Sequence, residues 1–221
     1  MTSPQHHLPD HLLLEYASAS VDPATRLVVS CHLTLCPLCR DKVARLDNVG
    51  GACLEQMQEA ELSPQGLSAL LGRLDEAVDA RKPPQTRSSV DARANAYALP
   101  RPLLTCLPNG ELKWRRWLPG VKGMTLDLGD AAAPARLVHF SPGITVPLHD
   151  HERTELVLVL DGQIQDGGED YRRGDVAVSD NGHAHTQKVD PGSPCVALIV
   201  NQGPLLPLTG WGRLLKLVTG V

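Results

Sequence analysis

The stretch HLTLCPLC carries three potential metal ligands, His32, Cys36 and Cys39. His32 and Cys36 lie four residues apart and therefore share one face of a helix. Pro37 ends that helix and opens the next, so Cys39 lies one turn beyond the corner. The corner brings three donors to one point, whereas a structural zinc site needs four. The candidates for the fourth ligand are His6, His7 and Cys31, with His11 and Cys53 less favoured.

The N-terminal arm supplies the fourth ligand more readily than the helix does. Cys31 directly precedes His32, and about 100° of helix rotation turns its side chain away from the corner. A histidine of the arm, His6 or His7, can fold back freely. The alternative is a redox-active Cys36–Cys39 pair, but such pairs usually open a helix that follows a strand. Because no strand pattern precedes Cys36, we expect zinc here.

A second group of potential ligands lies far downstream. In GITVPLHDHERTELVLVLDG, His149 and His151 fall on one face of a strand, because strand side chains alternate. Glu155 joins this face if the strand continues or resumes after a short turn. In GDVAVSDNGHAHTQ, His183 and His185 follow another strand that can pair alongside. Three imidazoles and one carboxylate suit zinc, iron, manganese, nickel or copper, and ligand type alone does not choose among them.

The first cluster requires helices to position it, and residues 10–80 show the pattern of four. Their predicted starts are Asp10 as a cap, Asp22 with Pro23, Pro37, and Ser63 with Pro64. The fourth helix carries one apolar stripe, made of Leu67, Leu71, Leu74 and Val78. This stripe either packs on its own bundle or lies in the groove of a partner, and we take it as the candidate partner-binding surface.

The second cluster requires a β framework, and from about residue 100 the hydrophobic period changes to two. Strands are predicted at ARLVHF, TELVLVLDGQIQ, DVAVSD and CVALIV, with no helices between them. This pattern favours an antiparallel sandwich or barrel. The stretch RKPPQTRSSVDARANA has no apolar period and is typical of a linker. We therefore predict a helical domain at 1–80, a linker at 81–98 and an all-β domain at 99–221.

Composition and charge limit the classes of function. The 221 residues are 42% hydrophobic and 21% charged, as in globular proteins that bury a core. Residues 1–80 hold five Lys or Arg against eleven Asp or Glu, so this half lacks the basic face that DNA requires and suits a basic protein partner. The sequence shows neither a secretory signal nor an apolar run of bilayer length. We therefore expect a cytoplasmic protein with no membrane or direct nucleic-acid partner.

The downstream cluster resembles the two cupin motifs. The first motif is matched by Gly143, His149, His151, Glu155 and Gly162. The second is matched by Gly174, Gly182 and His185, which selects His185 over His183, although Asp180 and Val189 replace a proline and an asparagine. The resemblance implies an antiparallel jelly-roll barrel with a metal held by His149, His151, Glu155 and His185. The alternative is a degenerate cupin that keeps the barrel without a metal.

The upstream cluster is similar to the zinc-binding anti-sigma domain, whose signature is an upstream histidine followed by His-x3-Cys-x2-Cys. That resemblance implies His7 as the first ligand, with His32, Cys36 and Cys39, and leaves His6 open. The helical domain and cupin together resemble the ChrR-type anti-sigma factors over nearly the whole chain. The family implies two zinc ions per chain and an extracytoplasmic-function sigma factor as partner, released when the cupin senses singlet oxygen or peroxide.

A competing class is a metal-dependent cupin enzyme of dioxygenase or isomerase type, with the helical half as a regulatory appendage. An open coordination position beside an apolar barrel could activate oxygen or a carbonyl. We expect the regulator and not the enzyme, because the joint arrangement of the two halves resembles the ChrR-type anti-sigma factors. The sequence leaves open whether the chain dimerises through its barrel.

Overall fold

The computed structural model describes residues 3–59, 63–76, 97–129, 134–203 and 205–207. The helices are α1 (Asp10–Ala17), α2 (Pro23–Leu35), α3 (Pro37–Glu55), α4 (Gly66–Glu76) and α6 (Arg101–Cys106), then the short helix η1 (Pro108–Gly110). The strands are β1 (Arg115–Leu118), β2 (Val121–Leu126), β3 (Ala135–Phe140), β4 (Thr145–His151), β5 (Glu155–Asp161), β6 (Gln163–Asp166), β7 (Glu169–Arg172), β8 (Val176–Ser179), β9 (His185–Val189), β10 (Cys195–Asn201) and β11 (Leu205–Pro207). The predicted combination of helical and antiparallel β halves is confirmed.

Proline and aspartate set the helix starts. Asp22 accepts hydrogen bonds from the backbone N–H groups of Ala24 and Thr25, both at 2.9 Å, and Pro23 is the first residue of α2, as predicted. The prediction that Asp10 caps α1 is wrong. The cap position falls on Pro9, and the Asp10 carboxylate lies 2.7 Å from the Lys42 ammonium of α3 instead.

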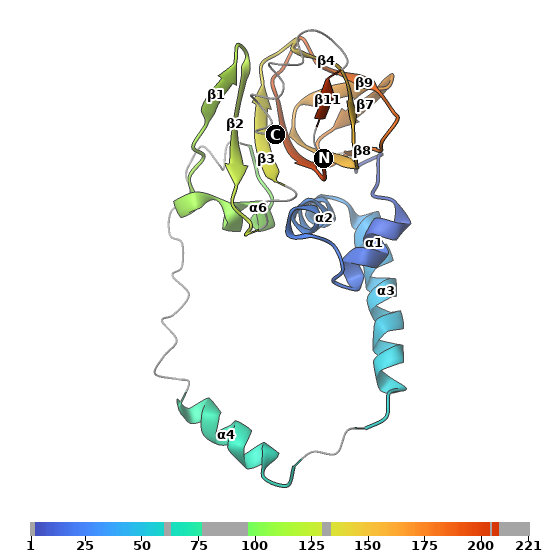
Figure 1. Cartoon of the computed structure of the whole chain (residues 1–221), viewed down its shortest axis with the longest axis vertical. Helices are drawn as coiled ribbons and strands as arrows, with labels where there is room; N and C mark the ends of the chain where they lie inside the picture. Colours follow the sequence, from blue (N-terminus) through green and yellow to red (C-terminus); the bar gives the residue numbers. More distant parts are fainter. Residues whose placement is uncertain (1–2, 60–62, 77–96, 130–133, 204, 208–221) are drawn as a thin grey trace.

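The strands form two facing sheets whose neighbours are all antiparallel. One sheet has the order β1-β2-β3-β10-β5-β8, and the other has the order β11-β4-β9-β6-β7 (Figure 1). Buried side chains from both sheets fill the space between them, among them Val138, Phe140, Val157, Ile164 and Val189. This barrel interior also holds the downstream histidines.

The helices cover the outer face of the first sheet. Figure 1 shows α2 and α6 beneath this sheet, and α2 contacts β5 and β10. Leu27, Val28 and Leu103 of these helices belong to the same hydrophobic cluster as Leu158 and Leu198 of the strands. Because both faces are covered, β5 is buried over all but its last residue, which explains its continuous apolar run.

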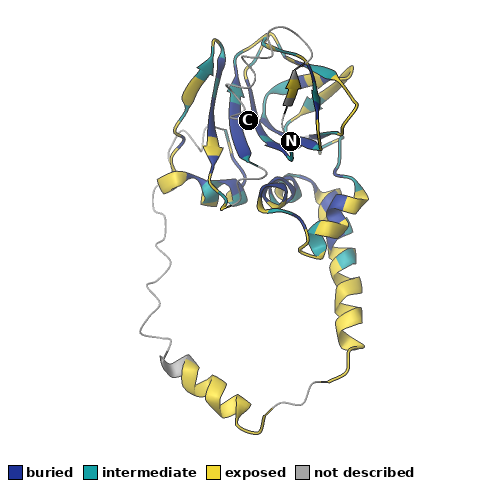
Figure 2. Ribbon diagram, viewed as in Figure 1, coloured by how far each residue is buried: buried dark blue, intermediate teal, exposed yellow. Residues whose placement is uncertain are grey.

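The far end of the helical half is uncovered. The second half of α3 and the described side chains of α4 are exposed (Figure 2), with exposed fractions of 69% for both Leu54 and Leu67. Leu71 of the predicted stripe is exposed as well; the Leu74 side chain and Val78 lie outside the described part of the chain. In the residues described, α4 thus does not bury its stripe on its own bundle. Residues 81–96 of the predicted linker 81–98 also lie outside them. No described helix is long and apolar enough to cross a bilayer.

Candidate metal centres

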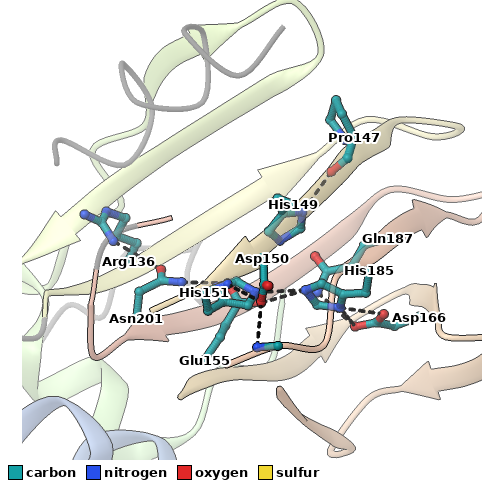
Figure 3. Close-up of polar contacts among 11 residues, drawn as sticks. Arg136, Pro147, His149, Asp150, His151, Glu155, Asp166, His185, Gln187 and Asn201 are labelled. Carbon is teal, nitrogen blue, oxygen red and sulfur yellow. Dashed lines mark hydrogen bonds and ion pairs between the residues drawn. The ribbon is translucent and has the colours of Figure 1, made fainter. Parts of the chain in front are cut away.

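Three strands bring the downstream ligands together inside the barrel (Figure 3). His149 and His151 lie at the end of β4, and their side chains point to the same face, as their spacing predicts. The strand then turns at residues 152–154, and Glu155 begins β5. His185 begins β9 and pairs directly with His149 across the two strands. One ligand atom from each of the four residues lies within 4.8 Å of those of the others.

The distances within this group fit a shared cation. The Nε2 atoms of His151 and His185 are 2.9 Å apart. Glu155 Oε2 is 3.4 Å from the first of these nitrogens and 3.7 Å from the second. This oxygen is buried and has no hydrogen-bond partner among the described residues, a costly state for a carboxylate unless a cation neutralises it.

In two of the histidine rings, a hydrogen bond at Nδ1 orients the Nε2 atom toward the centre of the site. His185 Nδ1 donates to the Asp166 carboxylate at 2.7 and 2.9 Å, and His149 Nδ1 donates to the Pro147 carbonyl at 2.8 Å. Each ring therefore keeps a lone pair on the Nε2 atom that faces the centre. Sequence reasoning missed Asp166, because an aspartate before Gly167 and Gly168 is typical of an ordinary turn.

Burial controls the protonation of the group. It lowers the pKa of His151 to about 4, with a further contribution from the neighbouring His149, so this imidazole is neutral at pH 7. Burial raises the pKa of Glu155 to about 7, although the hydrogen bond from Asn201 Nδ2 at 2.7 Å opposes the rise. Burial also lowers the pKa of His149. Burial acts in the same direction on His185, but the Asp166 carboxylate outweighs it and raises the pKa of that ring. A metal ion bound to these nitrogens and to the Glu155 oxygen would favour the unprotonated form of each ligand.

The structure also brings the upstream group together, at the junction of the arm, α2 and α3. The ligand atoms of His7, His32, Cys36 and Cys39 lie within 4.8 Å of one another. His7 Nδ1 is 3.3 Å from Cys36 Sγ. His6 points elsewhere, with its ring centroid 4.2 Å from that of Tyr171.

This second group also contains a buried polar atom that lacks a hydrogen-bond partner among the described residues, as expected of a metal ligand. His32 Nδ1 donates to the Gly174 carbonyl at 2.8 Å, and the buried Nε2 has no partner among the described residues. Burial raises the pKa of the Cys39 thiol to about 11, and the proximity of the Cys36 sulfur adds to the rise. A bound cation would give His32 Nε2 a partner and would favour the thiolate form of Cys39, because it stabilises neighbouring negative charge.

The barrel itself holds this helical site. Gly174 and Asp175 form the turn between β7 and β8, and the Asp175 carboxylate accepts the backbone N–H groups of Gln5 at 2.6 Å and His6 at 3.0 Å. The Val176 N–H donates to the His6 carbonyl at 3.3 Å. Gly174 has a φ of +93°, which disfavours any residue with a side chain. A Cβ there would also lie 2.7 Å from Pro4 of the arm and clash with it.

Two facing antiparallel sheets with three histidines and a glutamate converging between them define a cupin-like barrel, here joined to a helical half with its own His/Cys cluster. Residues 106–206 match the family model of the ChrR cupin-like domain. The chain is 34% identical over 203 residues to the anti-sigma-E factor ChrR of Cereibacter sphaeroides, which covers 91% of each chain. It therefore belongs to the ChrR family of anti-sigma factors, as the sequence motifs predicted.

A solved structure agrees over the same length. The crystal structure of Rhodobacter sphaeroides SigE in complex with the anti-sigma factor ChrR matches with a TM-score of 0.71 and 30% identity, over 89% of this chain and 98% of that chain. The match includes both the helical and the β halves. Both relatives are named as anti-sigma factors, which is the regulatory class that the sequence motifs predicted and not the competing enzyme class.

Proposed function

We propose that this chain sequesters an extracytoplasmic-function sigma factor through its helical half, in the cytoplasm and without contacting nucleic acid itself. The observation that carries the proposal is the uncovered apolar surface of α3 and α4. Val49, Leu54 and Leu67 are each more than 60% exposed, in a family with a member solved in complex with SigE. Large apolar side chains gathered on two helices suit a partner that covers them.

Zinc is the metal that we propose for the helical site, because two thiolates and two imidazoles are a ligand set of tetrahedral structural zinc. Its proposed ligands are His7, His32, Cys36 and Cys39. A bound zinc would tie the arm to the corner between α2 and α3, which stabilises a helical core of limited size.

The barrel site is proposed to hold zinc or another transition metal, since its donors do not distinguish among these metals. Its proposed ligands are His149, His151, Glu155 and His185. A bound cation there would act as a charge and Lewis-acid centre. The residues around it fix ring orientation and keep the centre nearly free of solvent.

We infer that an oxidative signal, singlet oxygen or peroxide, acts at the barrel site and weakens sigma binding. A route to the helical site runs through β8. Glu155 pairs with Ser179 at one end of this strand, and the turn at Gly174–Asp175, which holds His32 and the arm, leads into its other end. A displacement of β8 would therefore move groups that contact both metal sites.

The sigma-binding surface is tested by charging α4. Leu67→Glu together with Leu71→Glu should weaken the complex with the co-expressed sigma factor roughly tenfold or more, since buried interface anchors contribute about 1–2 kcal/mol each. The urea midpoint of the free protein should stay unchanged, because both side chains are exposed. Leu206→Glu on β11 is the matched control. Equal affinity of the α4 variant and this control would contradict the proposed surface.

The division between the two sites is tested by removing one ligand from each. His151→Ala should leave a 1:1 complex with the sigma factor that no longer dissociates on treatment with singlet oxygen or peroxide. Cys36→Ser should abolish the complex, because it removes a ligand at the helical corner. The measurement is co-purification with and without oxidant, with metal counting on each variant. A normal response of His151→Ala to both oxidants would disprove this division.

A further inference from the structure

A cavity of about 100 Å³ lies beside the barrel site, and nothing in the proposed function uses it. Its walls are mainly apolar, from Trp117, Val138, Phe140 and Ile144. At one end the lining becomes polar and includes Arg136, His149, Glu155, Gln187 and Asn201. The cavity is smaller than a typical ligand pocket but is partly open, and its lining suits a short molecule with one polar end.

The polar end contains a cation with few partners among the described residues. Arg136 is only 5% exposed, and its one hydrogen bond among these residues is a long one, 3.4 Å from Nη1 to Asn201 Oδ1 (Figure 3). No described carboxylate lies within ion-pair distance of its guanidinium; the nearby Glu155 instead accepts from Asn201 Nδ2. A guanidinium presents five donors, so the described part of the chain leaves most of its hydrogen-bonding capacity unused.

The guanidinium itself favours an anion. Its planar fork of N–H donors matches a carboxylate in shape and charge. The carboxylates around the barrel site are held by other groups: Glu155 accepts from Asn201, Asp166 from His185, and Asp150 from the backbone N–H groups of His151 and Gly182.

We propose that this cavity binds a small molecule with an apolar body and one carboxylate. The carboxylate lies on Arg136, and the body packs against Val138, Phe140 and Ile144. A neutral apolar ligand would leave the guanidinium buried and unpaired, and an inorganic anion would leave the apolar walls unfilled. The occupant also lies against His149 and Glu155, so its binding alters the surroundings of the barrel site. An effect on sigma release rests on the proposed function, whereas binding itself does not.

The test compares hexanoate with hexanol on the full chain carrying its metals, by isothermal titration calorimetry. Hexanoate should bind saturably at one molecule per chain and at least tenfold more tightly than hexanol, which has the same chain length without the charge. This comparison needs no variant and no sigma factor. Absence of saturable hexanoate binding, or equal affinity for the two compounds, would overturn the proposal.

Variants locate the charge that carries this preference. Arg136→Met should weaken hexanoate binding at least tenfold and leave hexanol binding nearly unchanged, whereas Arg115→Met, on the exposed edge strand β1, should alter neither. If Arg136→Met fails to fold, Val138→Phe tests the apolar wall and should weaken both compounds. A hexanoate affinity unaffected by Arg136→Met would place the carboxylate on the barrel metal and overturn the assignment to Arg136.

Discussion

At the scale of single residues, both clusters use the same device. A hydrogen bond on one ring nitrogen leaves the other nitrogen free to face the centre. His32 is held by the Gly174 carbonyl, His149 by Pro147, and His185 by Asp166. The ligands themselves could be predicted from spacing, because helical and strand periods decide which neighbours share a face. The partners that hold His32 and His185 could not, because they depend on contacts between separate segments of the chain.

Asp166→Asn tests this device at the barrel site. The amide oxygen can still accept the His185 proton, but it lacks the charge that orients the ring and raises its basicity. We expect roughly 10- to 100-fold weaker metal binding at the barrel site, with metal binding at the helical site unchanged. Metal competition with a chelator, followed by metal counting, measures both. Asp170 is an exposed residue of β7, and Asp170→Asn should retain the metal affinity of the native chain. A similar loss in this control would mean that the effect comes from the net negative charge of the protein and not from the hydrogen bond to His185.

At the scale of elements, sequence reasoning predicted helices and strands well where a local signal marks them. Pro23 and Pro37 begin α2 and α3, and the apolar runs coincide with β3, β5, β8 and β10. Asp10 was assigned wrongly as a cap because its actual partner, Lys42, lies on α3. The local sequence cannot reveal a contact between two residues so far apart in the chain. The stripe on α4 was recognised, but an amphipathic pattern is the same whether its own chain or another covers it.

Asp10 and Asp22 both lie at the start of a helix, so their alanine variants can be compared directly. Asp22→Ala removes the acceptor of two backbone N–H groups at the start of α2 and should lower the free energy of unfolding by about 1 kcal/mol. Asp10→Ala removes only an exposed ion pair with Lys42 and should lower the free energy of unfolding by clearly less than Asp22→Ala does, because water screens the two charges. Urea denaturation followed by circular dichroism measures both. An equal or larger loss for Asp10→Ala would mean that this residue caps α1 after all.

At the scale of the whole molecule, the two halves are joined more closely than their sequences indicate. Composition and period predicted a helical half and a β half with a linker between them. The structure adds that α2 and α6 pack on the outer face of the first sheet, within one hydrophobic cluster that includes Leu27, Leu103 and Leu198. This packing could not be predicted, because a continuous apolar strand shows only that both faces are covered and not which element covers them.

Leu198→Ala tests whether the halves unfold together. Leu198 is buried at the contact between β10 and the helices, and its truncation should cost about 2–5 kcal/mol. In the native chain, helical circular dichroism and tryptophan fluorescence should report one midpoint in denaturant, and the variant should shift both signals together. Leu206→Ala, at a partly exposed site on β11, should shift neither by much. Separate midpoints, with only the fluorescence displaced by Leu198→Ala, would show two independent domains.

The covered sheet face also limits how such a protein can be rearranged by recombination or by engineering. A barrel excised at residue 97 would lose α2 and uncover apolar side chains of β5 and β10 such as Leu158 and Leu198, while the helical half would lose the carbonyl that orients His32. A barrel taken from a relative would therefore fit these helices only if its outer face and its glycine turn came with matching partners. A graft that respects only the linker would separate residues that pack and bind together.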